Sequence, residues 1–306
     1  MRMSNVHMPL IAMVLAALPL ASASAHRQWI MPSQSVVDEE GKYVTFDAAV
    51  SESLFDFDSF PLKLDTLAIT GPDGQTVQPE NLSAGKLRST FDVKLAKPGL
   101  YRAAVVTTAV NASYMVAGET KRFRGSEAEL ATAIPKDATD VNISRAEGRV
   151  ESFVTVGEAT AVTPVGKGLE ILPLTSPADN VVGTPARFRV LIDGKPTPDI
   201  DVTVVPGAGR FRAKLGDTSI KSDAKGEILV NWPTAGNIWL GASWPPRPAG
   251  GPGGPGGPGG PGGPGAGGPG ARAAGSPAGG TAPVGPRPPA APRRLSYTAT
   301  YEVSPF

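Results

Sequence analysis

Short segments of alternating apolar and polar residues, separated by glycine and proline turns, restrict the fold of this chain more than any other feature. Val44, Phe46, Ala48 and Val50 share one face of such a segment. A period of two residues is typical of a half-buried β-strand, because successive side chains point to opposite faces of a sheet. The Gly-Pro-Asp-Gly sequence at 71–74 then predicts a turn, since proline fixes φ and Asp-Gly tolerates a tight reversal. The pattern predicts an all-β fold.

The same pattern occurs in both halves of the chain, and we predict two β-sandwich domains of the immunoglobulin-like or transthyretin-like type. The first is expected over residues 26–163 and the second over 169–306, with the linker at 164–168. Each half contains a late strand that follows a glycine turn. An aromatic residue lies near the start of each of these strands, Tyr101 in the first half and Trp239 in the second.

One short helix is predicted over residues 127–134. Ser126 can cap its first amide groups, and Glu129 stands three residues later as the partner in a capping box. Pro135 ends the helix. A helix of about two turns has little stability of its own, so we expect a connector that packs on a sheet.

Residues 245–294 interrupt the pattern with Gly-Gly-Pro repeats that carry almost no apolar side chains. Such a segment cannot offset the entropy lost on ordering, so we expect it to be disordered. A collagen-like structure is a weak alternative, because the run is short and interrupted. Leu295 and Tyr297 begin a new alternating segment. We therefore interpret the block as a long insertion in a hairpin that joins strands 238–244 and 295–303, because closure entropy grows slowly with loop length.

Residues 1–25 are predicted to be a signal peptide. Residues 10–21 form an apolar run too short to span a bilayer as a mature helix, and Arg2 supplies a positive charge before it. The sequence Ala-Ser-Ala at 23–25 matches the small-x-small cleavage pattern, so His26 would begin the mature chain. No second long apolar run follows, so we predict no stable membrane insertion. In a Gram-negative bacterium the product would lie in the periplasm.

Composition excludes several classes of protein. The chain has 29 basic and 28 acidic residues, and no basic stripe indicates a nucleic-acid partner. It has no cysteine, which excludes disulfides, thiolate metal sites and cysteine nucleophiles. It has no P-loop, dinucleotide fingerprint or zincin motif, and a Ser-His-Asp triad would need the N-terminal histidine as its base. We therefore predict a protein that is not an enzyme.

His26 is the first candidate metal ligand. The other histidine, His7, would leave with the signal peptide. The free α-amine and the imidazole of His26 could chelate one ion, and nitrogen ligands suit Ni(II) and Cu(II). One carboxylate from the following acidic cluster, Glu52, Asp56 or Asp58, would complete the site. The alternatives are that signal peptidase tolerates any residue at position 26, and that the cluster is an exposed loop over packed phenylalanines.

The segment that follows His26, Gln-Trp-Ile-Met-Pro at 28–32, resembles the start of a bacterial periplasmic family of unknown function. That family is described as a substrate-specific component of nickel uptake systems. The second half also resembles a transthyretin-like or peptidase-regulatory-like β-sandwich, with an Asp-Gly-Lys-Pro turn at 193–196. The resemblance covers nearly the whole mature chain through five further stretches, 46–50, 67–74, 121–125, 169–174 and 189–195.

The resemblance implies an all-β periplasmic protein that takes part in the import or handling of nickel or cobalt, with His26 as a ligand. Members often carry a further histidine in the loop that here comprises residues 57–60, and this chain lacks it. We expect a non-enzymatic accessory protein that binds nickel, cobalt or copper, with a metal transporter or another envelope protein as its partner. The alternative is a cell-envelope adaptor or adhesion-type module that binds no metal.

Overall fold

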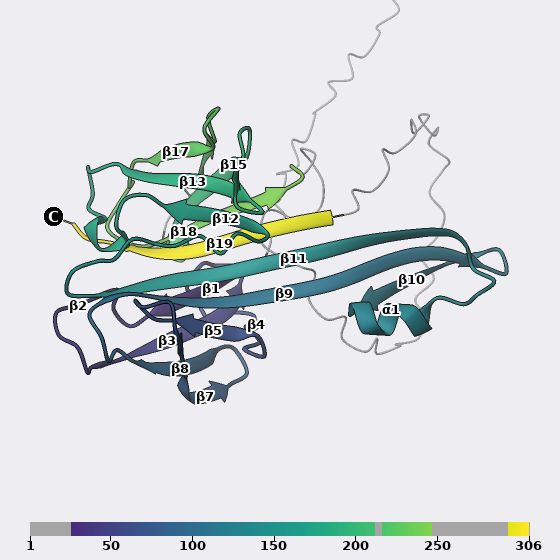
Figure 1. Cartoon of the computed structure of the whole chain (residues 1–306), viewed down its shortest axis with the longest axis horizontal. Helices are drawn as coiled ribbons and strands as arrows, with labels where there is room; N and C mark the ends of the chain where they lie inside the picture. The colour runs from purple at the N-terminus through teal and green to yellow at the C-terminus, as the bar shows by residue number, and fades with distance from the viewer. Residues whose placement is uncertain (1–25, 212–215, 247–292, 306) are drawn as a thin grey trace, which may run out of the picture.

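The computed structural model describes residues 26–211, 216–246 and 293–305 (Figure 1). These residues form three β-sheets, one α-helix and two short 3-10 helices. The predicted all-β fold with β-sandwich packing is confirmed. The predicted signal peptide, and residues 247–292 of the predicted Gly/Pro loop, lie outside the described residues. No helix among the described residues is long and apolar enough to cross a membrane.

The first sandwich packs a five-stranded sheet against one part of a ten-stranded sheet. Its core contains the apolar face predicted for Val44 to Val50, and the rings of Phe46 and Phe91 stack there at 4.8 Å. Val154 packs into the same core from the ten-stranded sheet. The five-stranded sheet has the order β1 (Arg27–Pro32), β3 (Tyr43–Ser51), β8 (Ser89–Lys94) and β7 (Glu80–Ala84), with β4 (Phe60–Pro61) beside β3.

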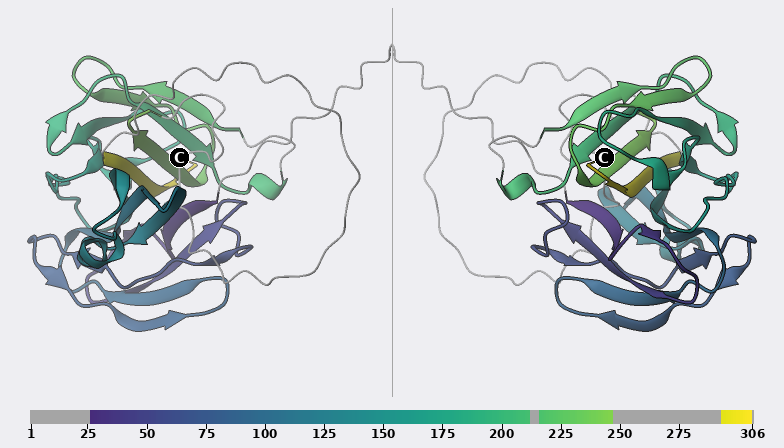
Figure 2. Two further views of the ribbon diagram at one scale, coloured as in Figure 1. Left: turned by 90° about the vertical axis from the view of Figure 1, so that its right-hand side faces the viewer. Right: turned by 90° about the vertical axis from the view of Figure 1, so that its left-hand side faces the viewer.

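The ten-stranded sheet runs through both sandwiches. In Figure 2, β19, drawn in yellow, lies between the green strands of the second sandwich and the purple and blue strands of the first. The sheet has the order β16 (Thr218–Lys221), β15 (Asp201–Pro206), β18 (Gly236–Trp244), β19 (Arg293–Val303), β11 (Thr139–Val156), β9 (Gly99–Val116), β5 (Leu67–Thr70) and β6 (Thr76–Val77), with β10 (Glu119–Gly125) beside β9 and β2 (Val36–Val37) beside β11.

The two parts of this sheet meet where β11 and β19 pair in parallel. Residues Arg145–Ser152 of β11 pair with Arg293–Thr300 of β19. Backbone hydrogen bonds therefore join the two sandwiches directly, in addition to the chain that passes through residues 164–168. That segment is itself held in place, because the Glu170 carboxylate accepts backbone N–H bonds from Val165 and Gly166 at 2.7 and 2.8 Å.

The second sandwich packs a four-stranded sheet against β15, β18 and β19. Tyr301 lies at the centre of its core, with ring centroids 5.4 Å from Phe188 and 5.7 Å from Phe153. Phe153 belongs to β11, so the first half of the chain contributes to the second core. The remaining elements are β12 (Leu169–Pro173), β13 (Ala186–Ile192), β14 (Lys195–Pro196), β17 (Glu227–Val230) and the 3-10 helices η1 (Pro177–Asp179) and η2 (Gly209–Phe211).

The pairing of β18 with β19 confirms the predicted last hairpin. Gly236–Trp244 pairs antiparallel with Leu295–Val303, across the long intervening segment. Leu295, Tyr297 and Tyr301 are buried in the second core, as their alternation predicts. An amphipathic strand resumes after the Gly/Pro block because its apolar face completes this core.

Strands β9 and β11 are much longer than the sequence pattern indicates, with 18 residues each. Their distal halves, with β10 and the helix α1 (Glu127–Ala133), extend beyond the sandwiches (Figure 1). We call residues 107–147 the arm. The helix has the predicted capping box, in which Ser126 and Glu129 satisfy each other's backbone amides. The sequence pattern did not predict these distal halves, because few residues of the arm are buried, among them Val110 and Ala112.

Candidate functional site

The register of β1 on β3 determines what lies beside His26. Arg27 pairs with Ser51 at the end of this antiparallel ladder. The preceding residue, His26, is therefore opposite the following one, Glu52. The Nε2 atom of His26 lies 3.7 Å from the Oε1 atom of Glu52, and the two side chains are 46% and 58% exposed.

An aromatic ring supports the imidazole on another side. The ring of Phe60 stacks on His26 with a centroid distance of 5.4 Å and an interplanar angle of 30°. Phe60 is held in position by β4, which pairs with Val50 of β3. The imidazole is thus positioned between a phenyl ring and a carboxylate while it stays accessible to solvent.

Asp58 organises the loop that carries Glu52. Its carboxylate accepts backbone N–H bonds from Glu52 at 3.0 Å and from Ser53 at 2.9 Å, and a hydroxyl bond from Ser59 at 2.9 Å. Partial burial opposes ionisation of Asp58, but these hydrogen bonds outweigh it and hold the pKa of the carboxyl below its usual value. The carboxylate of Asp58 therefore faces the loop backbone.

Asp56 lies in the same loop, where its backbone N–H donates to the carbonyl oxygen of Ser53 at 3.0 Å. Of the three acidic residues predicted as ligands, Glu52 is the one whose carboxylate pairs with His26. Within residues 26–211, 216–246 and 293–305, no group of three or more histidine, aspartate and glutamate side chains could hold a metal ion. A metal site here would therefore consist of two side chains and the main-chain amine of His26.

The loop 52–60 rests on a buried cluster at the junction of the two sandwiches. We call this set the junction cluster, and it consists of Trp29, Ala49, Leu54, Val205 and Trp239, all fully or almost fully buried. The indole N–H of Trp239, in the second sandwich, donates to the carbonyl oxygen of Gln28 in β1 at 3.0 Å. The N-terminal strand is thus attached to both halves of the molecule.

Two phenylalanines hold the loop on this cluster. Phe55 meets Trp29 edge-on at 5.4 Å, and Phe57 lies 5.7 Å from the same indole. Phe55 has a φ of +66°, in the left-handed region that bulky residues seldom adopt. Its ring packs against Gly207, where a Cβ atom would lie 2.8 Å from the ring. Phe55 and Phe57 thus pack beneath the loop, while Phe60 is 37% exposed, and the same loop carries Glu52 to His26.

Arg27 is a buried cation that no pattern in the sequence indicated. It is 9% exposed, and its guanidinium lies 5.6 Å from the ring of Trp239. Burial lowers the pKa of Arg27, and the charge of Asp217 partly opposes this shift. Successive side chains of a strand point to opposite faces, so this cation and the imidazole of His26 lie on different sides of β1.

The distance between His26 and Glu52 fits a shared divalent ion. Nitrogen and carboxylate ligands about 2.0–2.2 Å from one metal ion lie about 3–3.5 Å from each other. The observed 3.7 Å is slightly longer, and both side chains are exposed enough to close the difference by rotation. The donor set of imidazole, amine and carboxylate suits nickel, cobalt or copper.

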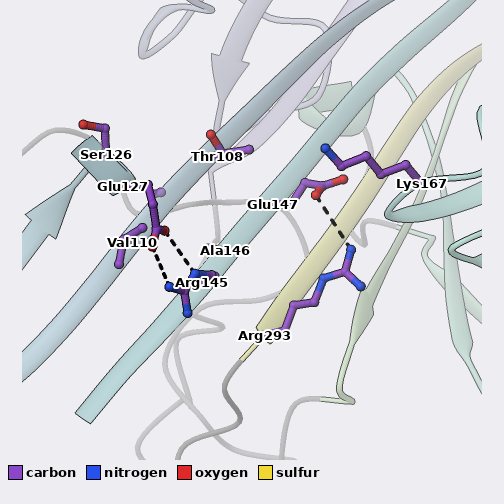
Figure 3. Close-up of a pocket in the computed structure, with 10 residues that line it drawn as sticks. Thr108, Val110, Ser126, Glu127, Arg145, Ala146, Glu147, Lys167 and Arg293 are labelled. Atoms are coloured by element: carbon purple, nitrogen blue, oxygen red, sulfur yellow. Dashed lines mark hydrogen bonds and ion pairs between the residues drawn. The ribbon is translucent and has the colours of Figure 1, made fainter. Parts of the chain in front are cut away.

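A separate hollow of about 500 Å³ lies between the arm and the second sandwich (Figure 3). Both of its arginines make ion pairs, and Arg293 also donates two hydrogen bonds to the Asp193 carboxylate at 2.5 and 3.0 Å. Arg145 makes two hydrogen bonds to Glu127 at 3.0 and 2.5 Å, and Arg293 lies 3.8 Å from Glu147. None of the four residues predicted as metal ligands lines this hollow.

Comparisons with known proteins identify a family but no activity. The profile of the family described as "Domain of unknown function (DUF4198)" matches residues 23–245. No curated protein matches the chain.

Two solved structures share little with the chain. The alignment with the D0-D1 domain of intimin covers 70% of this chain and 88% of the intimin chain, with 12% sequence identity and a TM-score of 0.19. The alignment with a DUF4785 family protein from Legionella pneumophila covers 70% of this chain and 50% of that protein's chain, with 8% sequence identity and a TM-score of 0.20.

Proposed function

We propose that this chain, which belongs to the DUF4198 family of unknown function, is an exported, non-enzymatic protein. It would bind one divalent transition-metal ion at its mature N-terminus. The ion is nickel, cobalt or copper, and its ligands are the α-amine and imidazole of His26 and the carboxylate of Glu52. The observation that carries the proposal is the 3.7 Å separation between the imidazole and this carboxylate.

The exposure of both ligands supports a role in metal delivery rather than storage. The side chains of His26 and Glu52 are 46% and 58% exposed, so a bound ion would remain in contact with solvent. Three ligands leave at least one coordination position for water or for a donor from another protein. A metal transporter in the cell envelope is the partner that fits such a site, with the ion as cargo.

The proposed absence of enzymatic activity is supported by the ligand chemistry available to the chain. The sequence has no cysteine, and its two histidines are His7, within the predicted signal peptide, and His26. The chain therefore offers no thiol nucleophile and, after the predicted cleavage, a single imidazole as a general base. The carboxylate of Glu52, which would share the proposed ion, lies 3.7 Å from the imidazole.

Titration calorimetry on protein that begins at His26 tests the proposal. We expect one Ni(II), Co(II) or Cu(II) ion per chain, since the amine and imidazole close a chelate on the same residue. A variant with one extra N-terminal glycine should bind at least about tenfold more weakly, because its amine is displaced from the imidazole. His26→Ala should abolish binding, and circular dichroism should show that both variants keep the fold.

Two outcomes would contradict this account. Equal binding by the glycine-extended protein would remove the amine from the site. No binding of any of the three ions by the correctly processed protein would remove the metal altogether, and the alternative of an envelope adaptor without metal would then stand.

A further inference from the structure

One face of the arm carries an ordered array of polar side chains. Strand β9 lies between β10 and β11, and directly opposed residues of antiparallel strands point to the same face. The register of these three strands produces two parallel rows. We call them together the arginine face, and they are Arg124–Asn111–Ser144 and Arg122–Ser113–Asn142.

The opposite face of the arm is covered by α1. The hydroxyl of Tyr114 donates to the carbonyl oxygen of Ala133 at 3.2 Å. A Cβ atom on Gly125 would lie 2.6 Å from both the Phe123 ring and the Glu129 carboxylate. Tyr114, Phe123 and Gly125 alternate with the residues of the arginine face along their strands, so α1 leaves the arginine face uncovered.

The two arginines of this face have no counter-charge from the described part of the chain. Arg122 and Arg124 are exposed, and neither makes an ion pair or a side-chain hydrogen bond with a described residue. Arg145, on the α1 side of the same arm, is by contrast held by Glu127 through two hydrogen bonds. A shallow groove of about 400 Å³ lies at the arginine face.

The chemistry of the array indicates what it could bind. Neighbouring rows are about 7 Å apart and the three strands span about 10 Å, from the spacing of residues and strands in a sheet. Guanidinium groups bind carboxylates through paired hydrogen bonds. The asparagine and serine side chains offer neutral donors and acceptors that suit hydroxyl groups. Charges on an edge strand can also serve to prevent edge pairing, but that role would not require polar residues on β9 and β11.

We propose that the arginine face binds a carboxylated oligosaccharide. Its carboxylates would meet Arg122 and Arg124, and its ring hydroxyls would meet the asparagine and serine side chains. An acidic peptide added to the free edge of β10 would reach the two arginines but not the side chains on the neighbouring strands. Residues 247–292 of this chain contain no aspartate or glutamate, so they do not supply the missing charge.

Binding of a galacturonic-acid oligomer to the whole chain tests the proposal, with a neutral malto-oligosaccharide of equal length and a glutamate peptide beside it. We expect the uronic-acid oligomer to bind most tightly, with an affinity that falls as salt screens the ion pairs. The double variant Arg122→Ala, Arg124→Ala should weaken binding about tenfold, the sum expected for two exposed ion pairs. Asn111→Ala with Asn142→Ala should also weaken it, although the charge is unchanged.

A matched control removes the same charge elsewhere. Lys63 and Lys86 are exposed in loops of the first sandwich, and replacing both with alanine should leave binding unchanged. The proposal would be overturned if this control lost as much affinity as the arginine variant. It would also be overturned if the neutral oligosaccharide bound as tightly as the uronic-acid oligomer. Tighter binding of the glutamate peptide, which would assign the face to an acidic polypeptide, or no binding of any probe, would overturn it as well. Circular dichroism should show that all variants keep the fold.

Discussion

At the scale of single residues, Glu52 reaches His26 through strand register and not through closeness in the sequence. The pairing of Arg27 with Ser51 brings the next residues on either side together. The sequence identified His26 and three acidic candidates, but it could not choose among them because it does not reveal how β1 lies on β3. Asp58 uses its carboxylate to hold the backbone N–H groups of Glu52 and Ser53.

Neutralising the carboxylate of Glu52 and that of Asp58 should therefore have different effects on metal affinity and on stability. Glu52→Gln should weaken metal binding about tenfold and leave the stability nearly unchanged, because its side chain is 58% exposed. Asp58→Asn should lower the free energy of unfolding by about 1 kcal/mol, since it weakens hydrogen bonds to a charged acceptor. Titration calorimetry and urea unfolding measure the two effects, with the exposed Asp65→Asn as control. Loss of affinity in Asp56→Asn but not in Glu52→Gln would show that the ligand is wrongly assigned.

Glu227 provides a test of the electrostatics in acid. Hydrogen bonds from Arg189 and Arg187, at 2.5 and 2.6 Å, lower its pKa from 4.5 to about 2. A carboxyl whose pKa is lower in the folded state stabilises the fold fully above its unfolded pKa, and the effect disappears as the pH falls toward the folded value.

The stabilisation from Glu227 should therefore be complete at neutral pH and disappear between about pH 4.5 and 2. Glu227→Gln should lower the melting temperature at pH 6 and have a much smaller effect at pH 2. Thermal unfolding followed by circular dichroism measures this, with the exposed Glu158→Gln as a control for loss of charge. An equal decrease at both pH values would contradict the assignment.

At the scale of secondary structure elements, local patterns predicted the elements that depend on local chemistry. The capping box of α1 and the amphipathic face of β19 were both predicted correctly, because each depends on residues close together in the chain. The distal halves of β9 and β11 were missed, since only a few of their residues, such as Val110 and Ala112, are buried and the alternating pattern is weak. The parallel pairing of β11 with β19 was also missed, because it joins distant segments without a turn to indicate it.

The loop 52–60 depends on a glycine at the end of β15. A Cβ atom at position 207 would lie 2.8 Å from the Phe55 ring and 2.8 Å from the Asn237 carbonyl oxygen. Gly207→Ala should lower the free energy of unfolding by about 1–3 kcal/mol, as overpacking of a close contact does. It should also weaken metal binding, because Phe55 and the loop that carries Glu52 must move.

A second variant separates local displacement from general loss of stability. Val190→Ala removes a fully buried side chain from the second core, at a cost of about 2 kcal/mol. It should leave metal affinity unchanged, as measured by calorimetry. Equal weakening in both variants would show that the binding site depends on overall stability and not on the position of Phe55.

At the scale of the whole molecule, the continuous ten-stranded sheet joins the two sandwiches into one structure. Three buried polar side chains lie where β11 meets β19. The guanidinium of Arg149 donates a hydrogen bond to the Glu151 carboxylate at 3.0 Å, and the hydroxyl of Tyr297 in β19 donates to the same carboxylate at 2.8 Å. Burial, together with the charge of Glu151, raises the pKa of Tyr297 well above its usual value. Buried charges of this kind are stable only when their partners are in place.

The two sandwiches should therefore unfold together. Tyr297→Phe should lower the free energy of unfolding by about 1–3 kcal/mol, because it removes a hydrogen bond to a buried carboxylate. Urea unfolding followed by far-UV circular dichroism and by tryptophan fluorescence should still give one coincident transition. Tyr43→Phe, at an exposed position, should have little effect. Two separate transitions would show that the shared sheet does not couple the sandwiches.

The most direct test of the proposed function is native mass spectrometry of the protein after expression of the full chain with its predicted signal peptide. We expect a chain that begins at His26 and carries one nickel, cobalt or copper ion, and the ion should be absent from the His26→Ala variant. A chain that begins at another residue, or one that carries no such ion, would contradict the proposed N-terminal metal site.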